Sequence, residues 1–199
     1  MRKHLVTALG LVAMALLAYP TRGEEGHREL GPHVHGHGTL NIAIEDKRVS
    51  LELEVPGMDI VGFEHAPSTD DQKSAVEKAK ARLEKPLGVF SLPAAAGCTV
   101  AEVKVAIEAE HAHHDGDDEK HDAKDDHDHD HDAAGGHNQF EATYALDCAN
   151  PSELTTITFD YFALFVGAHD LTVNVVTAKG QSKYEVSRSK PTLDLGGIM

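Results

Sequence analysis

Histidine and acidic residues are unusually dense between His111 and His137. This segment holds eight of the 15 histidines of the chain and ten acidic residues, but no large apolar side chain. Neutral imidazole is a strong ligand for zinc, copper and nickel, and neighbouring carboxylates can bind the ion or orient the rings. The segment therefore predicts a divalent-metal site, with zinc as the expected ion. The expected ligands are His111, His113, His114, His121, His127, His129, His131 and His137.

The same composition indicates how this segment should behave. Because it cannot bury a core, we expect residues 110–137 to form a disordered loop in the absence of a ligand. Ordering such a loop costs on the order of 1 kcal/mol per fixed residue, which favours modest affinity and fast exchange. Binding should weaken below about pH 6, where the rings take up protons. The alternative interpretation is an acidic, solubilising loop whose histidines are incidental.

A second histidine cluster precedes an apolar stretch. Alternate residues of an extended strand point to one face, so His33, His35 and His37 are expected to converge. Three imidazoles are the ligand set of an open zinc site. The alternative is a loosely ordered polar tail. Two isolated histidines, His65 and His169, each have an acidic neighbour and are favoured as structural residues, although either could complete this site.

Alternation between apolar and polar residues predicts the elements that position these histidines. Leu40–Ile44 and Leu51–Val55 alternate around a charged turn, which is typical of a β-hairpin with one buried face. A helix is predicted over Asp70–Lys85, with Ser or Asp as its N-cap and Pro86 as its stop. Shorter strands are predicted at residues 87–92, 154–159, 171–177 and 183–187.

Two cysteines lie at the far ends of the stretches that flank the His/Asp-rich segment. Both stretches alternate, which predicts a long hairpin with this segment at its tip. In an exported protein an even cysteine count favours a disulfide, and soft metal ligands are the alternative. Pairing Cys98 with Cys148 would place Val105 opposite Glu141. The bond would close a loop of roughly 50 residues and contribute on the order of 4 kcal/mol.

The first residues of the chain have the pattern of a signal peptide. A basic start is followed by the apolar run Leu5–Tyr19, and small residues suited to cleavage lie between Ala18 and Gly23. An uncleaved anchor is the alternative. Without residues 1–23 the chain has 15 basic and 33 acidic residues, a formal charge of −18. Such a surface repels nucleic acid and anionic lipid and attracts cations, and the mature form is not expected to be membrane-embedded.

These elements predict an α+β fold made mainly of antiparallel β-hairpins, with one or two helices and the long His/Asp-rich loop. Residues 24–199 are expected to form a single metal-binding domain. Two similar lobes, at residues 33–97 and 98–199, are a further arrangement that the pattern suggests. The sequence has no Gly-x-Ser-x-Gly, phosphate loop or His-Glu-x-x-His motif, so we expect a protein that is not an enzyme.

Three features together resemble a known family. They are the segment His33–Ile44, the stretch Glu54–Pro67, and the cysteine pair with its His/Asp-rich segment. In these features the chain resembles the zinc-regulated (Zrg-type) periplasmic zinc-binding proteins of Gram-negative bacteria, over nearly all of its length after residue 23. The resemblance implies Zn²⁺ ligands within His111–His137 and a partnership with an inner-membrane ABC-type importer.

The leading hypothesis is therefore a non-enzymatic periplasmic protein that captures zinc for import. One alternative is a periplasmic buffer or metallochaperone that gives tolerance to copper, nickel or zinc. Another is a metal-dependent periplasmic enzyme, and a third is an adhesion module with a passive acidic loop. A rigid, high-affinity site would favour acquisition over buffering, and the cluster of His33, His35 and His37 is the candidate for it.

Overall fold

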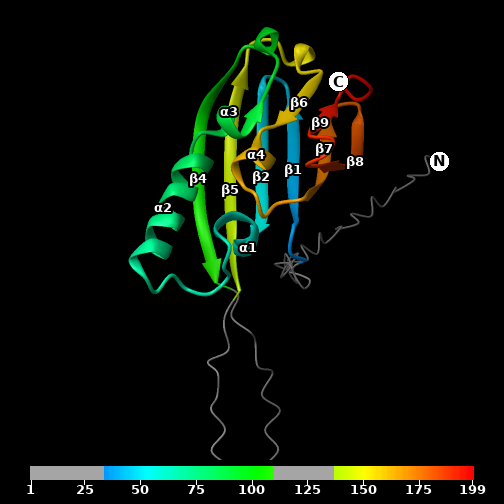
Figure 1. Cartoon of the computed structure of the whole chain (residues 1–199). Helices are drawn as coiled ribbons and strands as arrows, with labels where there is room; N and C mark the ends of the chain where they lie inside the picture. The colour runs from blue at the N-terminus through cyan, green and yellow to red at the C-terminus, as the bar shows by residue number, and fades with distance from the viewer. Residues whose placement is uncertain (1–33, 110–136) are drawn as a thin grey trace, which may run out of the picture. The chain divides into compact units, whose positions relative to one another are not determined.

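A six-stranded sheet forms the main layer of the protein. The computed structural model describes residues 34–109 and 137–199, which lie in one compact unit; the expected signal peptide lies outside these residues. Neighbouring strands are antiparallel except β1 and β7, which are parallel (Figure 1). In sheet order the strands are β4 (Cys98–Ala109), β5 (Asn138–Cys148), β2 (Arg48–Pro56), β1 (His37–Glu45), β7 (Asp170–Thr177) and β8 (Gly180–Ser187).

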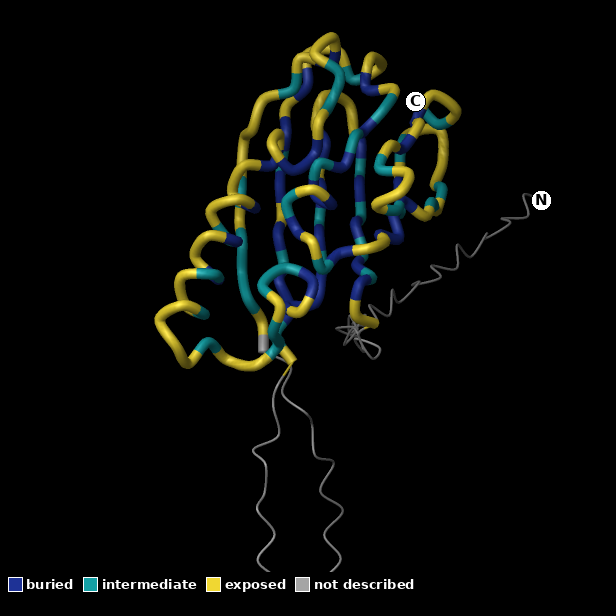
Figure 2. Tube along the Cα trace, viewed as in Figure 1, coloured by how far each residue is buried: buried dark blue, intermediate teal, exposed yellow. Residues whose placement is uncertain are grey.

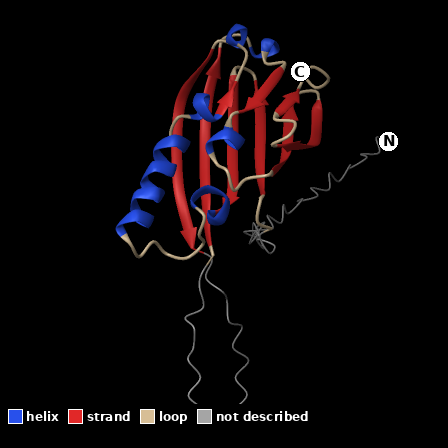
Figure 3. Cartoon of the chain, viewed as in Figure 1, coloured by secondary structure: helices blue, strands red, loops and turns tan. Residues whose placement is uncertain are grey.

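A second layer of helices and short strands covers one face of this sheet (Figure 3). Its strands form a small sheet in the order β3 (Phe90–Ser91), β6 (Thr156–Phe159) and β9 (Thr192–Asp194). Its helices are α1 (Gly57–Val61), α2 (Asp70–Leu83), α3 (Pro86–Val89) and α4 (Tyr161–Leu164), with 3₁₀ turns at Ala94–Ala96 and Pro151–Glu153. The expected α+β class, rich in antiparallel strands and poor in helix, is confirmed.

The hydrophobic core lies between the two layers. Each central strand contributes its apolar alternate residues, and Leu40 and Leu53, which pair across β1 and β2, are both completely buried. The second layer contributes Phe90, Phe159 and Phe165, which are equally well buried. Figure 2 shows this burial along the central strands and the exposed outer side of α2. The polar alternate residues of the strands lie on the opposite, open face of the sheet.

Several local predictions are confirmed and others need correction. The hairpin of β1 and β2 turns at Asp46, whose φ of 50° suits a tight turn. The long helix is α2, but Thr69 is its N-cap rather than Ser or Asp. The strand expected at residues 87–92 is reduced to two residues. Pro86 explains this, because its fixed φ suits the first position of a helix and it starts α3 instead.

The N-cap of α2 is a complete capping box. The Thr69 hydroxyl accepts the backbone N–H of Gln72 at 3.2 Å, and the Gln72 side chain accepts the backbone N–H of Thr69 at 3.2 Å. Thr69→Ala should therefore lower the free energy of unfolding by about 1 kcal/mol, measured by urea denaturation. Ser74→Ala, an exposed hydroxyl inside the same helix, is the control and should not destabilise the protein.

The register of the β4–β5 hairpin differs by one residue from the expected one. Cys98 pairs with Cys148 as predicted, but Val105 lies opposite Ala142 rather than Glu141. The cause is a β-bulge between Val100 and Glu102, which inserts one unpaired residue into β4. Beyond the bulge the residues of β4 that face the core are the odd-numbered ones. Val103, Val105 and Ile107 pack against it, opposite buried residues of β5.

Strands from both halves of the chain share the main sheet. β5 pairs with β2, and β7 pairs with β1, so strands before and after residue 97 are interleaved. The two lobes considered at residues 33–97 and 98–199 therefore do not form separate sheets. The parallel pairing of β1 with β7 was not expected from the sequence. It brings the turn before β1 next to the turn before β7, which matters for the site.

Candidate metal-binding site

Three separate segments meet at the end of the sheet where β4 finishes and β5 begins (Figure 1). They are the turn before β1, the stretch that follows α1, and the first residues of β5. The backbone N–H of Asn138 donates to the carbonyl of Glu64 at 2.7 Å, and the Asn138 side-chain amide donates to the carbonyl of His65 at 2.8 Å. These bonds fix the stretch after α1 against the start of β5.

The carboxylate of Glu64 lies between two imidazole rings. Nε2 of His35 is 2.9 Å from Oε1, and Nδ1 of His137 is 2.6 Å from Oε2. The Glu64 side chain is only 11% exposed, whereas the His35 and His137 side chains are 56% and 60% exposed. A largely buried carboxylate thus holds two rings that remain open to solvent.

The two rings keep Glu64 ionised. Burial alone would raise the pKa of this carboxyl, but the hydrogen bond with His137 and the close contact with the His35 ring outweigh it and hold the pKa below its usual value. Oε1 is buried and accepts no hydrogen bond of good geometry, although the His35 nitrogen lies close to it. One oxygen of a charged, buried group is therefore poorly satisfied.

A second buried carboxylate, that of Asp59 in α1, supports the same turn. Oδ1 of Asp59 accepts the backbone N–H of Gly36 at 2.7 Å, and no described residue hydrogen-bonds to Oδ2. Burial raises the pKa of Asp59 and Glu64 acts in the same direction, whereas the Gly36 hydrogen bond and the nearby His35 and His169 lower it. The net effect is a pKa above the usual range for an aspartate.

The turn at residues 35 and 36 depends on glycine. Gly36 has a φ of +84°, in the left-handed region that glycine adopts most easily. A Cβ at this position would lie 2.9 Å from Cδ2 of His169, and the backbone N–H of His169 donates to the Gly36 carbonyl at 2.8 Å. The parallel neighbour of β1 therefore fixes the turn that carries His35.

This turn changes the interpretation of the first histidine cluster. The extended strand begins only at His37, so strict alternation does not relate His35 to His37. Nε2 of His37 lies 3.0 Å from the hydroxyl of Thr172 on β7, and that hydroxyl donates to Glu185 of β8 at 3.1 Å. His35 and His37 thus have different partners, and their role as ligands stays a prediction.

The two isolated histidines lie beside the site. Nδ1 of His65 is 2.9 Å from the carbonyl of Ala66, and its ring stacks on Phe63 with 5.1 Å between centroids. His169 lies against Gly36, as described above. Both are exposed, and neither touches the Glu64 carboxylate through a hydrogen bond or ion pair that the structure shows within the described residues.

Most of the predicted ligands cannot be placed. Of the predicted metal ligands the structure describes His35, His37 and His137, and it joins His35 to His137 through Glu64. His33 and the seven histidines from His111 to His131 lie outside the described residues. Within residues 34–109 and 137–199, no group of three or more His, Cys, Asp or Glu side chains encloses a metal position as it stands.

The two carboxylates of the site were not predicted as functional residues. Asp59 and Glu64 both lie in the Glu54–Pro67 stretch, which carries the family resemblance, and that is the signal that could have pointed to them. Spacing alone could not, because Glu64 lies 29 residues from His35 and 73 from His137 along the chain. Only the folded sheet brings these three residues together.

Comparison with known proteins agrees with the resemblance. Within the described residues no helix is long and apolar enough to cross a membrane. No curated protein matches the chain significantly. Residues 32–195 match the family described as "ZrgA family zinc uptake protein", which covers the whole of the site. The chain therefore belongs to the ZrgA family of zinc uptake proteins.

Proposed function

We propose that this protein is exported to the periplasm, collects zinc with its His/Asp-rich segment, and passes the ion to an inner-membrane ABC-type importer. Membership of a zinc uptake family supports zinc as the cargo. The pattern of residues 1–23 supports export. The strongly acidic remainder of the chain supports collection, because a negative field raises the local concentration of cations.

One observation carries the proposal for the His/Asp-rich segment. Its two ends are fixed opposite each other, because Ala109 of β4 pairs with Asn138 of β5. The same end of the sheet carries His35 and Glu64, so the ligands of the segment are tethered next to an ordered imidazole–carboxylate cluster. A tethered segment can bring an ion to this cluster at a high effective concentration.

The affinity that such a segment can offer fits a collecting role. Many imidazoles and carboxylates can bind zinc in several arrangements, and fixing any one arrangement costs conformational entropy. The ion is therefore released quickly, which suits delivery better than storage. A buffer for excess copper or nickel is the competing function. Growth of a deletion strain separates the two, because an acquisition protein is needed under chelation and a buffer is needed under metal excess.

The experiment for the segment uses the full chain and changes only its ligands. Seven histidines are replaced by asparagine, and zinc binding is measured by calorimetry. We expect most of the bound zinc to be lost, while the stability of the zinc-free protein changes by no more than about 0.5 kcal/mol. The substituted residues are His111, His113, His114, His121, His127, His129 and His131.

The matched control keeps the composition of residues 110–136 and shuffles their order. Because no fixed geometry is required, the shuffled chain should bind as much zinc as the original chain. An unchanged zinc stoichiometry in the seven-histidine variant would reject the proposed role of the segment. A full loss of zinc binding in the shuffled chain would reject the claim that the segment binds zinc without a fixed geometry.

A further inference from the structure

We propose that β8, an edge strand of the main sheet, pairs with β8 of a second copy of this chain, so that the two main sheets join into one. In sheet order β8 is the last strand, and its neighbour among the described residues is β7. Figure 1 shows β8 at the right-hand margin of the sheet. The inference goes beyond the proposed function and does not depend on zinc, because none of the residues that carry it is a candidate ligand.

The hydrogen bonds at the end of β8 show which of its backbone groups face outward. The backbone N–H of Arg188 donates to the carbonyl of His169 at 2.9 Å, which continues the register between β8 and β7. Ser187 bonds on the other side of the strand, where its carbonyl accepts the backbone N–H of Lys190 at 3.0 Å. Backbone groups alternate between the two sides of a strand. The even-numbered residues of β8 therefore bond to β7, and the odd-numbered residues face outward.

The open part of this edge carries charged side chains. For the outward backbone groups of Gln181, Lys183 and Glu185, no hydrogen bond is shown within the described residues. All three residues are exposed, and Nζ of Lys183 lies 3.7 Å from Oε1 of Glu185. An unpaired edge is a template for another strand, and lysines on edge strands commonly oppose such pairing. Here the glutamate two residues further along makes the edge complementary to itself.

Charge selects one antiparallel register between the two copies of β8. Outward backbone groups must meet outward groups, so odd-numbered residues face odd-numbered ones. When Lys183 faces Glu185 of the second copy, the symmetric pair forms as well, and each pair exchanges both of its N–H···O bonds. A shift by two residues in one direction sets Lys183 against Lys183, and in the other direction it sets Glu185 against Glu185. Like charges directly opposite each other destabilise strand pairing, so both shifts are disfavoured.

Tyr184 lies on the two-fold axis of the selected register. Its own backbone groups bond to β7, so the two copies of Tyr184 would face each other without hydrogen bonds, the arrangement in which side chains approach most closely. Each ring is half-buried and packs at the margin of the core. Aromatic pairs across strands stabilise a sheet, and this pair would cover the exposed part of both rings. The charges on one face and the rings on the other thus favour the same register.

The size and symmetry of the contact indicate how the dimer should behave. β8 spans only Gly180–Ser187, and an interface made by one short strand falls below about 1,200 Å², the range of weak and transient contacts. Ser187 pairs with Asp170 at the end of the sheet that carries the candidate site. Because the second strand runs antiparallel, the two candidate sites would lie at opposite ends of the joined sheet. Zinc binding by each chain should therefore not change when the strands pair.

The test measures self-association of the purified protein by sedimentation equilibrium, with a chelator present so that zinc cannot link two His/Asp-rich segments. We expect the dimer fraction to rise with protein concentration up to about 1 mM. Lys183→Glu and Glu185→Lys, each alone, should weaken the dimer by at least about tenfold, because like charges then face each other. The double variant Lys183→Glu/Glu185→Lys restores opposite charges and should restore the dimer. Lys104→Glu, an exposed position on the opposite edge strand β4, changes the net charge equally and should have no such effect.

A cysteine on the two-fold axis tests the register directly. Tyr184→Cys should form a disulfide between two chains in oxidised glutathione, because residues facing each other without hydrogen bonds lie close enough for it. Gln181→Cys is the control, since its two copies would lie further apart than the roughly 7 Å between Cα atoms that a disulfide spans.

Three results would each reject the pairing of β8. They are a chain that stays monomeric up to about 1 mM, a double charge variant that remains as weak as the single ones, and a Gln181→Cys chain that cross-links as readily as Tyr184→Cys. The charge variants alter only exposed side chains, so they test the proposal even if Tyr184→Cys fails to fold by circular dichroism.

Discussion

Arg188→Ala should lower the free energy of unfolding by about 2–4 kcal/mol, although the residue lies outside the regular strands. Its guanidinium donates hydrogen bonds to four backbone carbonyls of one segment. Nη1 donates to the carbonyl of Phe162 at 2.5 Å. Nη2 donates to the carbonyls of Phe165 and Val166 at 2.9 Å each, and also to the carbonyl of Ala168.

The expected loss of stability follows from the backbone carbonyls that lose their hydrogen-bond donor when Arg188 is truncated. Phe162, Phe165 and Ala168 are buried, so water has limited access to their carbonyls once the guanidinium is removed. Hydrogen bonds to a charged donor contribute about 1.5–3 kcal/mol each in favourable cases. We discount their sum, because Arg188 itself is exposed and Val166 is 83% exposed. Arg188→Lys should restore only part of the stability, since an ammonium cannot reach all four acceptors.

The measurement is urea denaturation, with Lys183→Ala as the control. Lys183 lies on β8 and pairs with Glu185 at 3.7 Å, but both side chains are about two-thirds exposed, at 66% and 60%. Its loss should change stability by less than about 0.5 kcal/mol. A change of that small size in Arg188→Ala would contradict the role assigned to the guanidinium.

The same segment leads into the end of the sheet that carries the candidate site. Gly167 packs against the backbone of Asp59, with only 2.8 Å from its ideal Cβ position to Cα of Asp59. His169 then bonds to Gly36. Loosening this segment in Arg188→Ala should therefore speed hydrogen exchange at the amides of Gly36 and His169. Unchanged exchange there would show that Arg188 supports the core without supporting the turn.

Local patterning predicted the strands well because it reports burial directly. Leu40 and Ile42, like Leu51 and Leu53, alternate with polar residues, and these apolar residues face the core. A sheet with one buried face requires this period of two. The pairing of β1 with β7 joins residues that lie 133 apart, as Leu40 and Val173 do. Alternation identifies a strand but not its neighbour, so this pairing and the small second sheet could not be predicted from the sequence.

The bulge in β4 shows a different limit. Before it, Cys98 and Val100 pair with buried residues of β5; after it, the core-facing residues are Val103, Val105 and Ile107. The change from even to odd positions is visible in the sequence. When the whole of β4 is treated as one regular strand, however, the predicted register is wrong by one residue beyond Val100. A change of phase within an apolar pattern is the signal of such a bulge.

The candidate site was the least predictable part of the molecule. His35 and His137 were predicted as ligands, each within its own cluster, but nothing in their spacing joined them through Glu64. Gly36 also turned the first cluster out of the extended conformation on which its expected geometry rested. Composition thus identified the residue types suited to zinc, while their grouping depended on long-range strand pairing.

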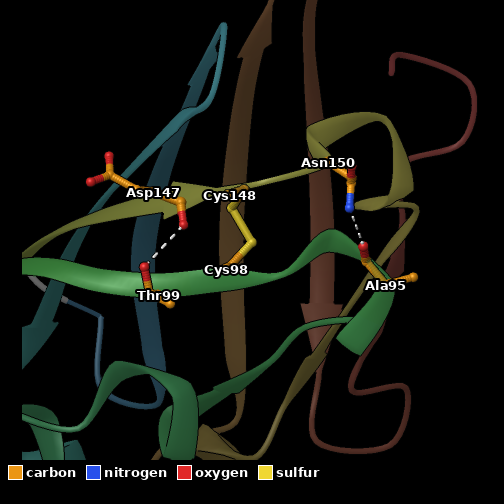
Figure 4. The surroundings of a disulfide bond; sticks show 6 residues. All are labelled: Ala95, Cys98, Thr99, Asp147, Cys148 and Asn150. Atoms are coloured by element: carbon orange, nitrogen blue, oxygen red, sulfur yellow. Dashed lines mark hydrogen bonds between the residues drawn. A yellow bond between two sulfur atoms is a disulfide. The ribbon is translucent and has the colours of Figure 1, made fainter.

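Loss of the disulfide between Cys98 and Cys148 should lower the free energy of unfolding by about 4 kcal/mol. This effect is as large as the one expected for Arg188→Ala. The predicted bond is confirmed, and it joins the first residue of β4 to the last residue of β5 (Figure 4). The sequence separation is 50 residues. In the chain-entropy model, closing a loop of this size removes much of the freedom of the unfolded chain.

The native hairpin should keep its register without the bond. Beside the cysteines, the hydroxyl of Thr99 donates to the carbonyl of Asp147 at 3.3 Å, and the amide of Asn150 donates to the carbonyl of Ala95 at 3.1 Å (Figure 4). The long ladder between β4 and β5 also remains. The stability loss should therefore come mainly from the unfolded state, and it should appear in the double variant Cys98→Ala/Cys148→Ala.

Zinc binding by the folded chain should survive this change. The cysteines lie at one end of the β4–β5 hairpin, and His137 with its Glu64 partner lies at the other. Zinc affinity measured under native conditions should therefore match that of the original chain, while the unfolding midpoint in urea falls. A loss of zinc affinity larger than about tenfold would instead mean that the bond orders the distant site directly.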